Sequence, residues 1–271
     1  MTVMGKGKPF LEVLSSALHE DYRFPILEIF AFLYALAAFV FTSFSPFYSA
    51  QSTPAGAATY SAITPLLSLP LFIFVILVFK NIAYGLGSDL EKGIIQTYFS
   101  YPLKRRGILT AKLLSALGVS LLLFLTIQIS ALSVLAPEVV LPHLNTVFLT
   151  YAASLSSVFL IAGIMLLLTL MLRRGGITLV VGIVLYFAMS IITSIAIFFS
   201  WATGSAVALQ IMAVISPNIA LQQYFGGLSE AFGQVWTPTL FEVQLYVGAS
   251  YMVVAFLFFL GYFYFSRRLN L

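Results

Sequence analysis

The chain has 271 residues, of which 61% are hydrophobic and only 8% are charged, with a mean hydropathy of +1.05. Soluble globular domains carry about 25% charged residues. This composition therefore excludes a soluble globular domain and indicates a membrane protein. The formal net charge of +4 comes from basic residues beside apolar segments, which favours a topological role over nucleic-acid binding. The absence of cysteine excludes disulfides, thiol chemistry and cysteine-ligated metals.

Residues 1–24 predict an amphipathic helix that lies on the cytoplasmic membrane surface. The apolar face of this helix consists of Phe10, Leu11, Leu14, Leu18 and Tyr22. The polar face consists of Glu12, Ser15, His19 and Arg23. Pro25 ends the helix, because the residue before a proline disfavours helical geometry, and the same proline can open the next helix.

Six later segments are apolar and long enough to cross a bilayer as helices, which satisfy their own backbone hydrogen bonds. These predicted spans lie near 25–44, 63–84, 109–135, 144–172, 177–200 and 241–265. We therefore expect one all-α, polytopic membrane domain over residues 25–271.

The stretch 201–225 is ambiguous in the sequence. Residues 201–215 are apolar, but they are few and are interrupted by Thr203-Gly204-Ser205. Ser216-Pro217-Asn218 then predicts a turn into a second short helix. The stretch is either an extension of the fifth span or a pair of re-entrant or short outer helices.

The basic residues fix the predicted orientation. Lysines and arginines occur before the first span, between spans 2 and 3, between spans 4 and 5, and after span 6. Stretches 45–62, 136–143 and 201–240 contain none. The positive-inside bias then predicts a multi-pass protein of the plasma (cell) membrane with both termini in the cytoplasm.

Two charged residues fall within predicted spans at a similar depth. Glu28 lies near the start of the first span and Lys80 near the cytoplasmic end of the second. Charges within a membrane are costly, so one interpretation is an intramembrane ion pair between them. The other is that each side chain reaches the cytoplasmic interface separately.

The segment between spans 2 and 3 is the most specific part of the sequence. Ser88 and Glu91 have the spacing of a capping box, and Asp89 would favour the positive end of a helix. Apolar residues recur at helical spacing up to Tyr98, and Pro102 ends the pattern. We expect a short helix over 88–100, with Gly93 in its middle. From the residues alone, a helix anchored to the membrane surface by its basic tail is the favoured interpretation.

The run Glu91-Lys92-Gly93, followed by Pro102, Arg105 or Arg106 and then Lys112, resembles the signature of the ABC-2 family of transporter permeases. Six spans, an N-terminal interfacial helix and a basic C-terminal end resemble that family too. Ile94 departs from the pattern, because the family usually has threonine there.

The resemblance implies that the helix between spans 2 and 3 is a coupling helix, which docks into a separate ATPase subunit. The positions that it assigns to ATPase coupling are Ser88, Asp89, Glu91, Gly93, Tyr98, Pro102, Arg105 and Arg106. It further implies a dimer with a second permease copy or a paralogue, and ATP and Mg bound by the partner ATPase.

The sequence therefore predicts the membrane-spanning permease subunit of an ATP-driven exporter, in contact with membrane lipid and not with nucleic acid. No G-x-x-x-x-G-K-[ST] run is present, so ATP hydrolysis must come from another chain and this chain is not itself an enzyme. Two alternatives remain: a membrane scaffold or assembly protein, and an intramembrane enzyme. The second is disfavoured because His19 and His143 are the only histidines and neither lies in a span. We expect no cofactor or metal site in this chain.

Overall fold

The computed structural model describes residues 8–43, 55–99, 103–135, 137–225 and 235–267. Within this part of the chain, six helices are long and apolar enough to cross a membrane. Their ranges are Ile26–Ser43, Leu66–Glu91, Arg105–Val134, Leu141–Leu172, Gly175–Thr203 and Leu240–Arg267. The protein is an all-α, multi-pass membrane protein, as the sequence predicts.

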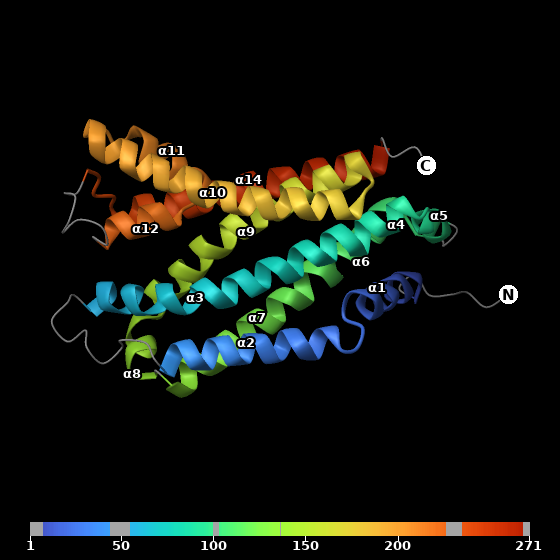
Figure 1. Ribbon diagram of the computed structural model, residues 1–271, viewed down its shortest axis with the longest axis horizontal. Helices are drawn as coiled ribbons and strands as arrows, with labels where there is room; N and C mark the ends of the chain where they lie inside the picture. The colour runs from blue at the N-terminus through green and yellow to red at the C-terminus, as the bar shows by residue number, and fades with distance from the viewer. Residues whose placement is uncertain (1–7, 44–54, 100–102, 136, 226–234, 268–271) are drawn as a thin grey trace.

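Figure 1 shows the described helices in chain order. The first half contains α1 (Lys8–Asp21), α2 (Ile26–Ser43), α3 (Ala55–Lys80), the π-helical segment η2 (Asn81–Gly87), α4 (Ser88–Glu91), α5 (Ile94–Phe99), α6 (Arg105–Leu113), the π-helical segment η3 (Leu114–Val119) and α7 (Ser120–Leu135). The second half contains α8 (Pro137–Val140), the 3₁₀ turn η4 (Leu141–His143), α9 (Leu144–Leu172), α10 (Gly175–Thr203), α11 (Val207–Ile215), α12 (Asn218–Tyr224) and α14 (Leu240–Arg267).

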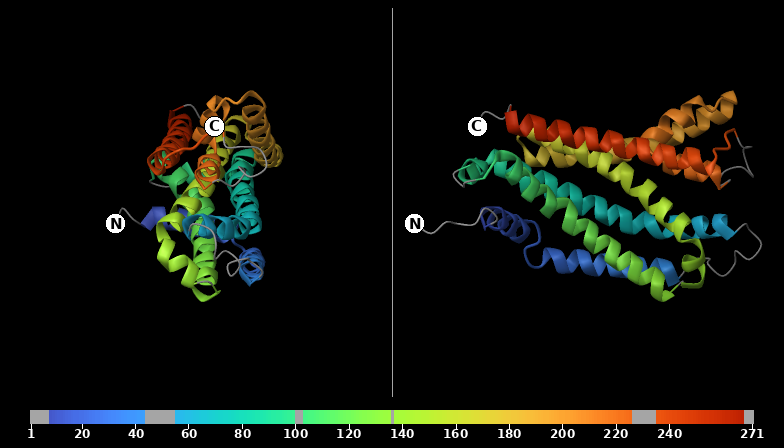
Figure 2. Two further views of the ribbon diagram at one scale, coloured as in Figure 1. Left: turned by 90° about the vertical axis from the view of Figure 1, so that its left-hand side faces the viewer. Right: turned by 180° about the vertical axis from the view of Figure 1, so that it is seen from behind.

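The two ends of the bundle differ in what they carry. Helices α1, α4 and α5 lie at one end together with the last turn of α14, whereas α8 and α12 lie at the other (Figures 1 and 2). The α9–α10 connection, which carries Arg173 and Arg174, also lies at the α1 end. We call this the basic end of the bundle.

Helix α9 forms the centre of the bundle and contacts α3, α10 and α14. Small residues allow α14 to lie close alongside it: a Cβ atom at Gly261 would come within 2.7 Å of Leu166, and one at Gly163 within 3.0 Å of Leu257. By contrast, only 11% of the α10 span is buried, against 61% for the α9 span. The apolar outer face of α10 is therefore left for lipid or another protein.

Helix α1 packs against the start of the third long helix through one face. Val13, Ala17 and Asp21 are buried, and Val13 packs against Ile108 and Ala111 at the start of the third long helix. On the apolar face that the sequence predicts to lie on the membrane, Leu11 is 61% exposed, whereas Phe10 and Leu14 are half-buried.

Helix α10 ends at Thr203, followed by Gly204 in a left-handed conformation with φ of 66°. Helices α11 and α12 then fold back, and both contact α14. The Asn218 side-chain amide donates a hydrogen bond to Ser154 Oγ in α9 at 3.1 Å. The stretch 201–225 thus combines both predicted possibilities: a short extension of the fifth long helix, and two short packed helices.

Candidate functional site

The most distinctive region at the basic end is the segment that connects the second and third long helices. Helix α3 continues through η2 into α4 without interruption, and the backbone N–H of Ser88 donates to Tyr84 O. Gly87 has helical φ and ψ of −68° and −42°, and no side chain caps α4. The predicted capping box of Ser88 and Glu91 is therefore wrong. The same continuity removes the free helix start that Asp89 was expected to favour.

Gly93 lies between α4 and α5 and not within a helix, which corrects the second prediction for this segment. Its φ is 71°, in the left-handed region that favours glycine. The Lys92 N–H donates to Ser88 O at 2.9 Å and ends α4, and α5 then takes a new direction. A Cβ atom on Gly93 would have no neighbour within 4 Å, so conformation and not close packing accounts for the glycine.

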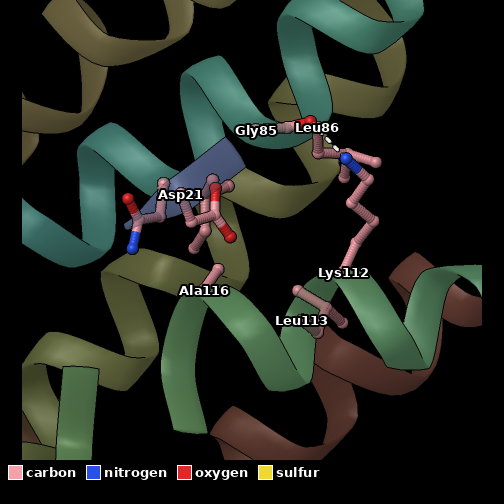
Figure 3. Close-up of a pocket in the computed structure, with 8 residues that line it drawn as sticks. Asp21, Gly85, Leu86, Lys112, Leu113 and Ala116 are labelled. Atoms are coloured by element: carbon pink, nitrogen blue, oxygen red, sulfur yellow. Dashed lines mark hydrogen bonds between the residues drawn. The ribbon is translucent and has the colours of Figure 1, made fainter. Parts of the chain in front are cut away.

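A buried lysine attaches this segment to its neighbours. Lys112 of α6 is 3% exposed, and its Nζ lies 2.6 Å from Asp89 Oδ2 and 2.7 Å from Glu20 Oε2. The ammonium also donates to Gly85 O at 3.4 Å (Figure 3). One cation thus connects α1, η2, α4 and α6. Removing one partner of such a buried pair leaves an uncompensated charge, which typically costs about 3–5 kcal/mol.

Helix α5 is held by weaker contacts. The Tyr98 hydroxyl lies 3.3 Å from Ser16 Oγ of α1, and Lys112 Nζ lies 5.3 Å from the Tyr98 ring centre. The guanidinium of Arg105 lies 4.8 Å from the ring centre of Phe99. Helices α4 and α5 therefore form one projection, supported by α1 and α6.

A second polar network lies beside the first one. The Ser115 hydroxyl donates to the carboxylate of Asp21, and the Tyr22 hydroxyl donates to Ser115 O at 2.9 Å. Asn81 Nδ2 donates to the Tyr22 hydroxyl at 3.0 Å, and Ser120 Oγ lies 2.8 Å from it. These contacts join the end of α1 to η2 and η3.

Burial changes the acidity of two residues in this network, Asp21 at the end of α1 and Tyr22 directly after it. Burial raises the pKa of Asp21 to about 6, although the Ser115 hydrogen bond and the nearby charges of Lys112 and Lys80 lower it in part. Burial also raises the pKa of Tyr22 above its ordinary value. Asp21 is thus a carboxyl group that can gain a proton near neutral pH.

Glycines allow the backbones at the basic end to approach closely. A Cβ atom on Gly85 would lie 2.5 Å from Asp21 Oδ1, so the glycine leaves room for the carboxylate. A Cβ atom on Gly87 would lie 2.9 Å from the Cα of Gly175, and one on Gly175 would lie 2.5 Å from Ala83 O. The first turn of α10 therefore packs directly against η2.

The predicted pair of Glu28 and Lys80 is not formed. Lys80 Nζ donates instead to Asp21 O at 2.7 Å and to Asn81 Oδ1 at 2.9 Å. Glu28 is exposed, and no ion pair joins it to Lys80. The acceptor that Lys80 uses is the backbone carbonyl of Asp21 at the end of α1, and not the carboxylate of Glu28 in the first long helix.

The predicted coupling residues differ in exposure. Asp89 is buried, Ser88, Gly93 and Tyr98 are half-buried, and Glu91, Arg105 and Arg106 are exposed; Pro102 lies outside the described residues.

Sequence reasoning missed a set of polar residues that the fold brings together: Glu20, Asp21, Tyr22, Asn81, Ser115 and Ser120. Asn81 could have pointed to this network, because a polar residue at the end of an apolar segment needs a hydrogen-bond partner. The identity of that partner was not available from spacing.

Within the described part of the chain, no group of three or more histidine, aspartate or glutamate residues is placed to hold a metal ion. Comparisons with protein-family models, with curated proteins and with solved structures find no match. What the arrangement offers physically is a projection that is rigidly connected to a long membrane helix.

Proposed function

We propose that this chain is the membrane-spanning permease subunit of an ATP-driven exporter of the ABC-2 type, with ATP and Mg bound by a separate ATPase subunit. The observation that carries the proposal is the projection formed by α4 and α5 at the basic end. Helix α4 continues directly from α3, and the buried Lys112–Asp89 pair fixes it to α6. A push on the projection would therefore move two long helices together.

The outer surface of the projection is available to a partner. Glu91, Lys92 and Gln96 are exposed, and Ile94 is 39% exposed. Charged and apolar groups side by side are suited to a protein partner. Asp89 is 1% exposed, so we assign it a positioning role and leave contact with the ATPase to Glu91.

The low burial of three long helices supports a dimer with a second permease copy or a paralogue. Only 22% of the α2 span, 11% of the α10 span and 22% of the α14 span are buried. Two such faces from two copies would enclose the substrate path, and the remaining apolar surface would contact lipid. In a scaffold protein, the same projection would hold a partner without moving a solute.

The test uses a charge reversal on the exposed surface of the projection. We expect Glu91→Arg to leave the chain folded and inserted, but to weaken co-purification of an ATPase from native membranes by at least about tenfold, equivalent to one lost charged contact. Glu138→Arg is the matched control, because Glu138 is an exposed acid at the opposite end of the bundle.

The captured protein must carry a phosphate-binding loop and must hydrolyse ATP, whereas the purified chain alone should not. ATPase capture that is unaffected by Glu91→Arg would refute the docking surface. Nucleotide hydrolysis without substrate movement in proteoliposomes would favour the scaffold.

A further inference from the structure

An open cleft of about 500 Å³ is lined by residues of α1, η2, α4 and α5. Its walls include Arg23, Ile26, Lys80, Tyr84 and Tyr98. The carboxylates of Glu20, Asp21 and Asp89 and the imidazole of His19 also line it. The cleft lies at the basic end, beside the projection but on the side of α1.

The acidic groups of the cleft are already engaged by the protein. Glu20 and Asp89 both lie within ion-pair distance of Lys112, and Asp21 accepts a hydrogen bond from Ser115. Glu20 and Asp89 are therefore held from behind the cleft wall by Lys112, and Asp21 is held there by the neutral hydroxyl of Ser115.

The cations at the cleft mouth form no direct ion pair of this kind, although the charges of Asp21 and Glu20 lie near Lys80. Among the described residues, no carboxylate lies within ion-pair distance of Lys80 or Arg23. Lys80 is half-buried, and its ammonium donates only to a backbone carbonyl and to an amide oxygen. An ammonium has three donors, so one is left for a ligand. This free donor of Lys80 and the exposed side chain of Arg23 together favour an anionic ligand.

The cleft lies where a membrane helix begins. Ile26 is the first residue of the α2 span, Phe24 beside it is 77% exposed, and Tyr84 is 47% exposed. Exposed aromatic side chains at the end of an apolar helix are typical of the interface at which lipid headgroups lie. The anion at this depth is then the phosphate of a lipid.

We propose that this cleft binds the phosphate group of one membrane phospholipid, with Lys80 and Arg23 as its ligands. Hydrogen bonds from these cations to a phosphate are charge-assisted and stronger than neutral ones. Ile26 and Tyr84 contact the glycerol and the first acyl carbons. The bound lipid fills the space between α1 and η2. Ile94 lines both this cleft and the surface of the projection, but the proposed ligands Lys80 and Arg23 lie outside that surface, so lipid binding can be measured without the ATPase.

The test measures lipid binding to the purified full chain in detergent by native mass spectrometry. We expect dioctanoyl phosphatidylglycerol to bind one-to-one and dioctanoylglycerol, which lacks the phosphate, to bind at least about tenfold more weakly. Arg23→Gln and Lys80→Gln should each weaken phosphatidylglycerol binding by a similar factor. Lys104→Gln, which removes an exposed charge at the same end but outside the cleft, should leave it unchanged.

Each other outcome overturns the proposal. Equal binding of the two lipids would show that the phosphate is not recognised. Competition by soluble glycerol phosphate at equal concentration would identify a water-soluble ligand. An equal loss in Lys104→Gln would indicate a general charge effect. If Lys80→Gln unfolds because Asp21 O loses its donor, Arg23→Gln alone decides, because the Arg23 side chain is exposed and forms no ion pair with a described residue.

Discussion

Lys112 of α6 and Asp89 of α4 form an ion pair of 2.6 Å in which the two side chains are 3% and 1% exposed. The pair lies between two long helices that are separated in the sequence by the whole projection. The ammonium is shared with Glu20 of α1, whose side chain is 41% exposed. Lys112 is thus the point at which three segments of the basic end meet.

Replacing Lys112 with methionine should destabilise the protein strongly. Lys112→Met keeps the length of the side chain but leaves Asp89 buried without a counter-charge, and the expected loss is about 3–5 kcal/mol. Thermal unfolding in detergent measures the effect. Glu20→Gln is the matched control, because the Glu20 side chain is itself 41% exposed, and it should cost about 1 kcal/mol or less.

The double variant Lys112→Met with Asp89→Leu should recover most of the lost stability, since well-packed apolar groups can replace a buried pair at little cost. If Lys112→Met alone unfolds at the same temperature as the wild type, the ion pair does not hold the projection.

Substitutions at Gly93 should act through backbone conformation. Gly93→Val should destabilise the turn between α4 and α5 by about 1–2 kcal/mol, because a branched side chain opposes the left-handed geometry. Gly93→Asn should cost less, because asparagine tolerates that geometry. Hydrogen exchange of the amides in residues 88–99 measures the loosening.

Gly176→Ala is the control for Gly93. Gly176 lies in the first turn of α10, has no positive φ, and an added Cβ atom would meet nothing within 4 Å. Alanine there should be neutral or slightly stabilising. Equal exchange rates in Gly93→Val and the wild type would contradict the assignment of Gly93 to a left-handed turn.

The stability of the protein should depend on pH through Asp21. Burial raises the pKa of this carboxyl to about 6, so the folded protein binds the proton more tightly than the unfolded chain does. Its contribution to stability is therefore fully present below the unfolded pKa of about 4 and is lost as pH rises through about 6.

Asp21→Asn keeps an acceptor for Ser115 but cannot ionise. Between about pH 5 and pH 8, the wild type should lose about 1 kcal/mol of stability relative to this variant. Thermal unfolding of both proteins across that range measures the difference. The charged groups around Asp21 are Lys112, Lys80 and Glu20, and all three remain in the variant. Parallel pH curves for the two proteins would show that Asp21 does not titrate in this range.

The topology can be tested with single cysteines, because the chain has none of its own. Cysteines at Glu138 and Thr237, which are exposed away from the basic end, should react with an impermeant thiol reagent added outside cells. Cysteines at Lys104 and Arg174 should react only after the membrane is permeabilised. Labelling of Arg174→Cys from outside would overturn the orientation with cytoplasmic termini.

The sequence alone determined the number and approximate extent of the long helices. The fourth predicted span, 144–172, coincides with α9, and the sixth, 241–265, lies within α14. The reason is physical: in lipid each apolar segment must satisfy its own backbone hydrogen bonds, so composition and length suffice to locate a helix. The positions of Pro25 and Gly204 near helix ends could also be predicted from the sequence, because proline and glycine act on the local backbone.

Only the tertiary structure decided how the basic end is built. Ser88 has the spacing of a helix cap, but η2 carries α3 past it, and this depends on packing against Gly175 of α10. Lys80 was matched with Glu28 by depth, whereas the fold gives it Asp21 O. Lys112 and Glu20 are 92 residues apart in the chain, and no local pattern relates them. Periodicity along the chain specifies a helix, but the partner of a buried charge depends on which distant segments the packing brings within about 3 Å.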